Sequence, residues 1–441
     1  MSTDAEMPRH SAEYRRRRLL NWVPLGLTYA AFYMGRYNFN VVKGDLGKYY
    51  HLDKAQIGAI ATAGFWTYAA SVMVNGPLTD KLGGRRAILV GAFGAATMNL
   101  IVGLLFLRMW ASHLVVGMSV LYALCMYFQS FGAVSVVKVN AAWFEVRERG
   151  VMGGLFGIFI SSGYALAMTL GGKVLGWSKA AFGVGPLAFS SVFLLPAAII
   201  FLLFLVDAKF VQNSPKAAGV APKIEGEDRA APEEKVSMRK VLGVVLRHPI
   251  IRVIMLAEFC TGFVRQGLLL YNIEFLDEVH HVKVGSSIQS WSGAGITLGG
   301  ICGGLLCGWM SDRLFDSRRP PVAFIFYLGQ IASLIVLGQV KSAGMAAFMI
   351  GFSCMWIFGV HGMLSGTASA DFGGKKAAAT ATGLLDGVQY IASGLTGIWL
   401  GRLLVKYHWG IWTWSLIPFS AGGALLMLLI WKAKPGADGG H

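Results

Sequence analysis

Charge is scarce in this chain of 441 residues, and acids are scarcer than bases. Asp, Glu, Lys and Arg together make up 14% of the residues, with 23 acids against 39 bases, whereas 55% of the residues are hydrophobic. A soluble domain of this size exposes more charge than that. Apolar runs of about 17–25 residues, long enough to cross the roughly 30 Å hydrocarbon layer of a bilayer, recur along the chain. The composition therefore predicts a polytopic membrane protein and excludes an ordinary soluble domain.

Cysteines are few, and catalytic motifs are missing. The cysteines lie in apolar runs without the spacing of metal ligands, so we interpret them as packing residues. They are Cys125, Cys260, Cys302, Cys307 and Cys354. The sequence has no phosphate-cradling glycine loop of the Walker type and no nucleophile paired with a base. It thus predicts neither an enzyme nor ATP-driven transport, and no metal or cofactor.

The net charge of +16 does not indicate nucleic-acid binding, because the basic residues stand in short clusters between apolar runs. The positive-inside rule explains such clusters and predicts that both termini are cytoplasmic. Arg15–Arg18 precede a long apolar run without a small-residue cleavage site, so we expect a retained tail and not a signal peptide. The opposite side is not free of charge, since the first loop there contains Lys43, Lys48 and Lys54.

Twelve apolar runs predict an all-α membrane protein with twelve transmembrane helices in two six-helix halves. The expected spans are 20–42, 56–76, 87–107, 112–137, 150–175, 183–206, 250–275, 287–310, 322–340, 344–368, 377–402 and 410–431. The predicted domains are a cytoplasmic tail at 1–19, a bundle at 20–206, a polar cytoplasmic linker at 207–248, a bundle at 249–432 and a tail at 433–441.

A repeated motif supports this division into halves. Gly76-Pro-Leu-Thr-Asp80-Lys-Leu-Gly-Gly-Arg85-Arg86 recurs as Gly308-Trp-Met-Ser-Asp312-Arg-Leu-Phe-Asp-Ser-Arg318-Arg319. The two aspartates are 232 positions apart, and two arginines within apolar runs, Arg36 and Arg265, are 229 apart. A single duplication explains both offsets, so we expect the arginines at equivalent places in the first helix of each half. Transporters built from parallel repeats bind substrate between the halves near the bilayer midplane.

An arginine inside a membrane span indicates a functional site, because placing it near a helix centre costs roughly 2.5–3.5 kcal/mol. Tyr29, Tyr33 and Arg36 follow one another at i, i+4 and i+7 and share a helical face. Two such arginines with few obvious partners predict an anionic ligand, since guanidinium groups suit paired phosphate oxygens. In the alternative interpretation, each arginine is neutralised by an internal acid such as Glu258 or Asp386.

The loop Gly-x-x-x-Asp-(Lys/Arg)-x-Gly-x-Arg-Arg after the second span, present in both halves, resembles that of the major facilitator superfamily. Nearly the whole chain is similar to the organophosphate:phosphate antiporters, which include bacterial glycerol-3-phosphate and hexose-phosphate transporters. The stretch from Tyr29 to Phe39 resembles the family's first helix, in which two tyrosines and an arginine line the phosphate site. Arg265 stands where the family has its second phosphate arginine. Tyr68 matches a family tyrosine, whereas Val72 occupies the place of a family lysine.

The resemblance implies a substrate site between the halves, to which we assign two groups of residues. The candidate binding residues are Arg36, Arg265, Tyr29, Tyr33, Tyr68, Lys138, His361, Asp386 and Tyr390. For the tyrosines and His361 the alternative is packing, for Lys138 it is snorkelling to the interface, and for Asp386 it is pairing with a base. The candidate gating residues are Asp80, Arg85, Arg86, Asp312 and Arg318, which would latch one conformation at the cytoplasmic ends of helices.

The predicted function is the exchange of a small phosphorylated metabolite for inorganic phosphate, by alternating access in a single chain. Glycerol phosphate, hexose phosphates, phosphoglycerates and phosphate itself all remain open as substrates. One alternative is a proton-coupled carrier of another small organic anion, with Asp386 or His361 titrating. The other is a membrane sensor of hexose phosphate. The expected location is the bacterial inner membrane, and no nucleic-acid partner is expected.

Overall fold

A computed structural model describes residues 11–107, 113–144, 158–159, 161–220, 243, 247–368 and 383–433 of the chain. These residues form helices joined by short turns. In this part of the chain, nine helices are long and apolar enough to cross a membrane. The prediction of an all-α membrane protein is confirmed. Parts of three expected spans lie outside the described residues, at 112, at 150–157 with 160, and at 377–382.

The first half consists of antiparallel helices, the first two of which begin at side-chain caps. Its elements are α1 (Ala12–Tyr50), α2 (Lys54–Leu82), α3 (Gly84–Leu107), α4 (Leu114–Gln129), α5 (Phe131–Trp143), the π-helix η1 (Ala167–Gly171), α7 (Gly172–Phe182) and α8 (Pro186–Phe210), followed by the short η2 (Lys216–Ala218). Ser11 caps α1, and a capping box of Asp53 and Gln56 starts α2. The expected span 112–137 is divided between α4 and α5, which meet at Ser130.

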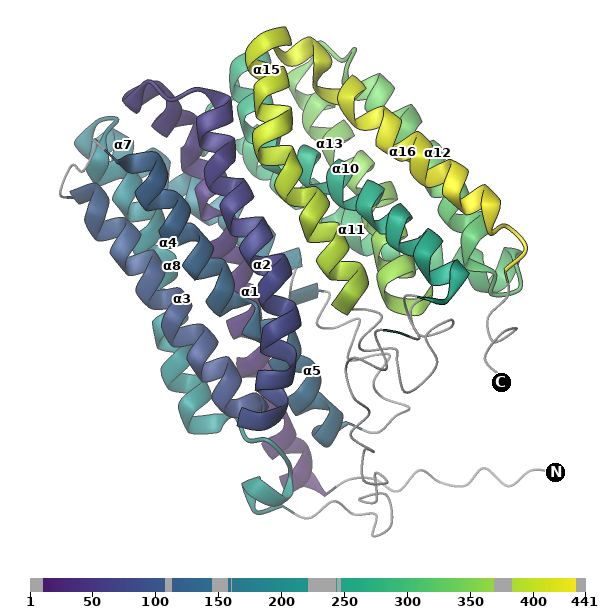
Figure 1. Ribbon diagram of the computed structural model, residues 1–441. Helices are drawn as coiled ribbons and strands as arrows, with labels where there is room; N and C mark the ends of the chain where they lie inside the picture. The colour runs from purple at the N-terminus through teal and green to yellow at the C-terminus, as the bar shows by residue number, and fades with distance from the viewer. Residues whose placement is uncertain are drawn as a thin grey trace.

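The second half repeats this plan. Its elements are α10 (Pro249–His280), α11 (Ser287–Leu314), α12 (Arg319–Leu337), α13 (Ala343–His361), the π-helix η3 (Gly362–Ala368), a helix over 383–395, the π-helix η4 (Thr396–Leu400), α15 (Gly401–Tyr407), η5 (Trp409–Ile411) and α16 (Trp412–Leu429). In Figure 1 the purple to teal helices of the first half and the teal-green to yellow helices of the second half stand as two bundles.

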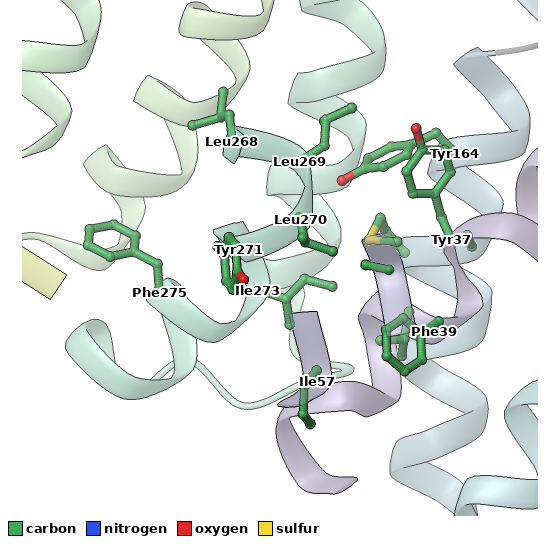
Figure 2. Packing of buried hydrophobic residues seen from close by; sticks show 14 of the residues in the cluster. Tyr37, Phe39, Ile57, Tyr164, Leu268, Leu269, Leu270, Tyr271, Ile273 and Phe275 are labelled. Carbon is green, nitrogen blue, oxygen red and sulfur yellow. The ribbon is translucent and has the colours of Figure 1, made fainter. Parts of the chain in front are cut away.

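The two bundles share an orientation. The beginning of α1 and the end of α16 lie at the lower end in Figure 1, which we call the proximal end. The end of α1 at Tyr50 and the end of α10 at His280 lie at the opposite end, which we call the distal end. Apolar packing joins the halves, because one buried cluster includes Phe39 and Ile57 of the first half and Leu269 of α10. Figure 2 shows side chains of this cluster from both halves, with Leu270 and Ile273 of α10 on the side toward Phe39.

The bundles also approach each other closely where α2 meets η4. A Cβ atom on Gly58 would lie 1.9 Å from the carbonyl oxygen of Gly397, so any side chain at position 58 would force the helices apart. Thr62 Oγ1 donates to the Gly394 carbonyl at 2.6 Å, and Trp66 Nε1 donates to the Ile391 carbonyl at 3.0 Å. This interface therefore combines glycines in close contact with hydrogen bonds between side chains of α2 and the backbone of the opposite helix.

Candidate functional site

Arg36 lies in the middle of α1 and is fully buried. Its Nε donates to Gln129 Oε1 on α4 at 3.1 Å, and its Nη1 donates to the Tyr390 hydroxyl at 2.8 Å. Tyr390 belongs to the second half, so the second bond crosses between the bundles. The buried Nη2 has no hydrogen-bond partner among the described residues. A buried guanidinium with an unused N–H donor can donate a charge-assisted hydrogen bond to an anion.

Aromatic rings surround the Arg36 guanidinium. Its Cζ lies 4.7 Å from the centre of the Tyr33 ring, 4.3 Å from that of Tyr68 and 5.9 Å from that of Tyr390. Tyr29 packs edge-on against Tyr33, with the ring centres 5.5 Å apart. The structure thus brings Tyr33 and Tyr68 to Arg36 and packs Tyr29 against Tyr33. Cation–π contacts stabilise the buried charge without neutralising it.

Arg265 occupies the equivalent place in the second half. It lies on α10, is 6% exposed, and has its Cζ 5.4 Å from the centre of the Tyr390 ring. Its Nε and Nη2 are buried and have no hydrogen-bond partner in the described part of the chain. The two arginines therefore converge on Tyr390 from opposite bundles. Within the described residues neither guanidinium has a carboxylate within 4 Å, so neither is locked in an ion pair.

The acids near Arg265 form a separate group. Glu258, two turns before Arg265 on α10, is fully buried, and its Oε2 lies 3.3 Å from His361 Nδ1. Gln389 Nε2 contacts both groups, at 3.3 Å from Glu258 and 2.7 Å from His361. Asp386, one turn before Tyr390 on the helix over 383–395, is partly buried and interacts electrostatically with Arg265 and His361. His361 and Asp386 thus belong to the second-half wall of the site.

The candidate gating residues lie away from the arginines. Lys138, expected at the phosphate, forms an ion pair with Asp80 at 2.6 Å, and both side chains are partly exposed. Asp312 pairs with Arg319 at 2.9 Å. The other members of the group contact backbone or solvent: Arg85 donates to the Ala208 carbonyl at 2.7 Å, Arg318 donates to the Phe315 carbonyl at 3.2 Å, and Arg86 is exposed.

Ion pairs at the distal end join the two halves. Lys43 of α1 donates to Glu274 of α10 at 2.6 Å, and both side chains are buried. Beside it lie two further pairs, whose side chains are more exposed: Lys48–Asp277 at 2.5 Å and Lys54–Glu278 at 2.9 Å. A cavity of about 330 Å³ is lined by residues of these pairs. The three lysines that the positive-inside rule left unexplained are therefore paired with acids of the other half.

Sequence reasoning missed two glutamines of the site and the acids of the distal end. Gln129 and Gln389 are uncharged, so a search for costly charges in apolar runs passes over them, although each is an amide inside a long apolar run. Glu274 lies in the last turns of α10, and its pairing with Lys43 was not predicted. In the described part of the chain no group of His, Cys, Asp and Glu is arranged to hold a metal.

Comparison with known proteins places this geometry in context. A family model described as Major Facilitator Superfamily matches residues 25–397. The membrane sensor protein UhpC of Salmonella typhimurium is 27% identical over 434 residues, which cover 94% of this chain and 91% of that protein. The glycerol-3-phosphate transporter of Bacillus subtilis is 27% identical over 443 residues, covering 97% and 95%. A probable hexose phosphate transport protein of Chlamydia trachomatis is 25% identical over 466 residues, covering 98% and 94%.

A solved structure supports the fold. The bacterial homolog of the human lysosomal transporter Spinster, in an inward-facing and occupied conformation, superposes with a TM-score of 0.76 at 17% identity. The match covers 96% of this chain and 98% of that one.

Proposed function

Since the chain belongs to the Major Facilitator Superfamily, we propose that it is a secondary transporter that exchanges a small phosphorylated metabolite for inorganic phosphate. The family consists of transporters, not enzymes, and its membership confirms the resemblance seen in the sequence. Two of the relatives named above are transporters of phosphorylated compounds, by their names: one of glycerol-3-phosphate and one, a probable transporter, of hexose phosphate.

One observation supports an anionic phosphate substrate above all. Arg36 and Arg265, buried and free of ion pairs with described acids, approach the same Tyr390 ring and keep unused N–H donors. Phosphate offers oxygens to both guanidinium groups at once, and charge-assisted bonds of this kind are stronger than neutral ones. Tyr29, Tyr33, Tyr68 and Tyr390 supply rings and hydroxyls for the organic part of the substrate.

The same charges give a reason for exchange. Two unpaired guanidinium groups are costly to enclose without water, because each buried charge loses its hydration. A bound phosphate neutralises them and lets the halves rock around the site. The empty carrier would return slowly, so phosphate or a phosphate ester must move in each direction. The site is assembled within one chain, so we infer that a monomer suffices.

The orientation in the membrane follows from charge. We infer that the proximal end, with Arg85, Arg86 and Arg318, faces the cytoplasm of a bacterial inner membrane, because Lys and Arg are retained on that side. We propose two six-helix bundles joined by a cytoplasmic linker. Because α8 continues to Phe210, this linker begins after that residue and not at 207.

Exchange is tested with the purified chain in vesicles preloaded with unlabelled phosphate. We expect uptake of labelled phosphate that disappears in vesicles without internal phosphate. The variant R265Q should lose uptake, whereas D207N, at a buried carboxylate that accepts from Thr28 in the first half, should retain it. Competition by glycerol phosphate, hexose phosphates and phosphoglycerates identifies the ester. Uptake of neutral sugars without any phosphate effect would reject the proposal.

A second candidate is a sensor. The relative named as a membrane sensor is as similar, at 27% identity, as the glycerol-3-phosphate transporter. The same vesicles separate the two functions, because binding of a hexose phosphate without any flux favours the sensor.

A further inference from the structure

The ion pairs at the distal end are segregated by sign between the halves. In each pair the lysine belongs to the first half, and the acid belongs to α10 of the second half. The pairs are Lys43–Glu274, Lys48–Asp277 and Lys54–Glu278. A latch between the halves needs opposite charges, but it does not need every base on the same side. When the distal ends separate, one rim therefore keeps three cations and the other rim keeps three anions.

The distal cavity lies between these two rims. Its volume of about 330 Å³ is large enough for a small-molecule site, since such sites measure about 300–1,000 Å³. The three lysines line it from the first half, and Glu274 and Glu278 line it from α10. Asp53 also lines it from the first half, where its carboxylate caps α2 by accepting from the Gln56 backbone N–H at 2.7 Å. These first-half residues thus carry three positive charges against one negative charge.

Lys43 connects the distal cavity to the central site. It follows Arg36 by seven residues on α1, so the two side chains share a helical face and lie about 10 Å apart along the axis. Its Nζ donates to Glu274 at 2.6 Å and lies 4.4 Å from the centre of the Tyr271 ring, and both partners belong to α10. Separation of α1 from α10 therefore takes these partners away and leaves Lys43 between the distal solvent and Arg36.

We propose that Lys43, Lys48 and Lys54 form a second anion site, which binds phosphate or a phosphate ester when the distal end is open and delivers it to Arg36. The inference rests on the proposed function. The anion takes the place of the acids that the lysines lose when α10 moves away, and hydrogen bonds from ammonium groups to phosphate oxygens are charge-assisted. The acids of the opposite rim repel the anion, so it is directed onto α1, the helix that carries Arg36.

The second site makes the two ends of the protein unequal toward their substrate. A ligand that binds one conformation better than the other shifts the equilibrium toward that conformation. Phosphate at the distal end therefore stabilises the distal-open state by competing with the acids of α10 for the lysines. The affinity for an anion arriving from the distal side depends on these lysines, whereas the affinity for one arriving from the proximal side does not.

The test compares exchange from the two sides, in right-side-out and inside-out membrane vesicles preloaded with phosphate. K48Q/K54Q removes the two more exposed lysines, which are 58% and 24% exposed, and leaves the buried Lys43–Glu274 pair in place. We expect the KM for external inorganic phosphate to rise about fivefold where the distal end faces outward, the effect of two partly exposed charge contacts. Where the proximal end faces outward, the KM should stay as in the wild type.

The matched control breaks the same two pairs from the other side. D277N/E278Q removes the acids but leaves the lysines, so the KM for phosphate at the distal end should fall. If the pairs only hold the halves together, the two double variants change this KM in the same direction, and that result overturns the second site. An unchanged KM in K48Q/K54Q, or an equal rise at both ends, overturns it as well. Each of these results leaves the exchange proposal standing, whereas absence of exchange by the wild type in both vesicle types overturns both proposals.

Discussion

Lys43 and Glu274 offer a sharp test of how the two halves are held together. Their 2.6 Å ion pair joins α1 to α10 at the distal end, and the side chains are 1% and 6% exposed. The substitution K43M leaves Glu274 buried and unpaired in the conformation described above. Removing one partner of a buried pair costs about 3–5 kcal/mol. Because the pair forms only when the distal ends meet, this cost falls on that conformation alone.

The expected shift is large. A difference of about 3 kcal/mol changes a two-state equilibrium by more than a hundredfold, which turns a dominant state into a minor one. Spin labels on Val184, in the turn before α8, and on Lys283, in the loop after α10, measure the separation of the distal ends in a cysteine-free background. The wild type should give mainly a short distance, and K43M mainly a longer one.

The neighbouring pair supplies a matched control. Lys48 and Asp277 join the same two helices but are 58% and 29% exposed, and exposed pairs contribute about 0–1 kcal/mol. The variant K48Q should therefore change the distance distribution little, and the double variant K43M/E274M should recover most of the short distance. An unchanged distribution in K43M, or an equal shift in K48Q, would refute the assignment of Lys43 and Glu274 as the link that closes the distal end.

Three further predictions concern the site and the interface between the halves. R36K keeps the positive charge but loses the planar guanidinium that reaches both Gln129 and Tyr390. We expect the dissociation constant for phosphate to rise more than tenfold, because a hydrogen bond to a charged group contributes about 1.5–3 kcal/mol. Y390F loses the 2.8 Å bond to Arg36 but keeps the ring, so phosphate binding should weaken less than in R36K; an equal loss would contradict the assigned role of the ring. G58V places side-chain atoms against the Gly397 carbonyl without any change of charge. The spin labels at positions 184 and 283 should then report the longer distance, and a distribution that stays short would contradict the close contact of Gly58 with Gly397.

The sequence alone predicts the helices, the division into halves and the pair of arginines, because the cost of burying charge in a membrane is visible in one dimension. The tyrosines of α1 also follow from helical spacing. The contacts of Arg36 with Gln129 and Tyr390 do not, because they depend on how α4 and the helix over 383–395 rotate about their axes. Lys138 shows the same limit, since its pairing with Asp80 is set by the approach of α5 to α2.

The distal ion pairs were, in contrast, within reach of the sequence. Lys43 and Glu274 are 231 positions apart, and Lys48 and Asp277 are 229 apart, close to the 229 that separates Arg36 from Arg265. Matching helices of a duplicated fold face each other across the axis that relates the halves. Residues one repeat apart near that axis are therefore neighbours, as the bond from Asn40 Nδ2 to the Leu269 carbonyl, also 229 positions apart, illustrates.

The contact between α2 and the helix that leads into η4 has a consequence for how this interface tolerates change. Thr62 and Trp66 donate to the carbonyls of Gly394 and Ile391, and every amino acid carries a carbonyl. On the helix that carries these carbonyls, only the size of the side chains is restricted. Position 391 can take many residues, whereas positions 394 and 397 must stay small. Substitutions at position 391 would therefore leave the hydrogen bonds between the halves intact, whereas substitutions of the donors Thr62 and Trp66 on α2 would remove them.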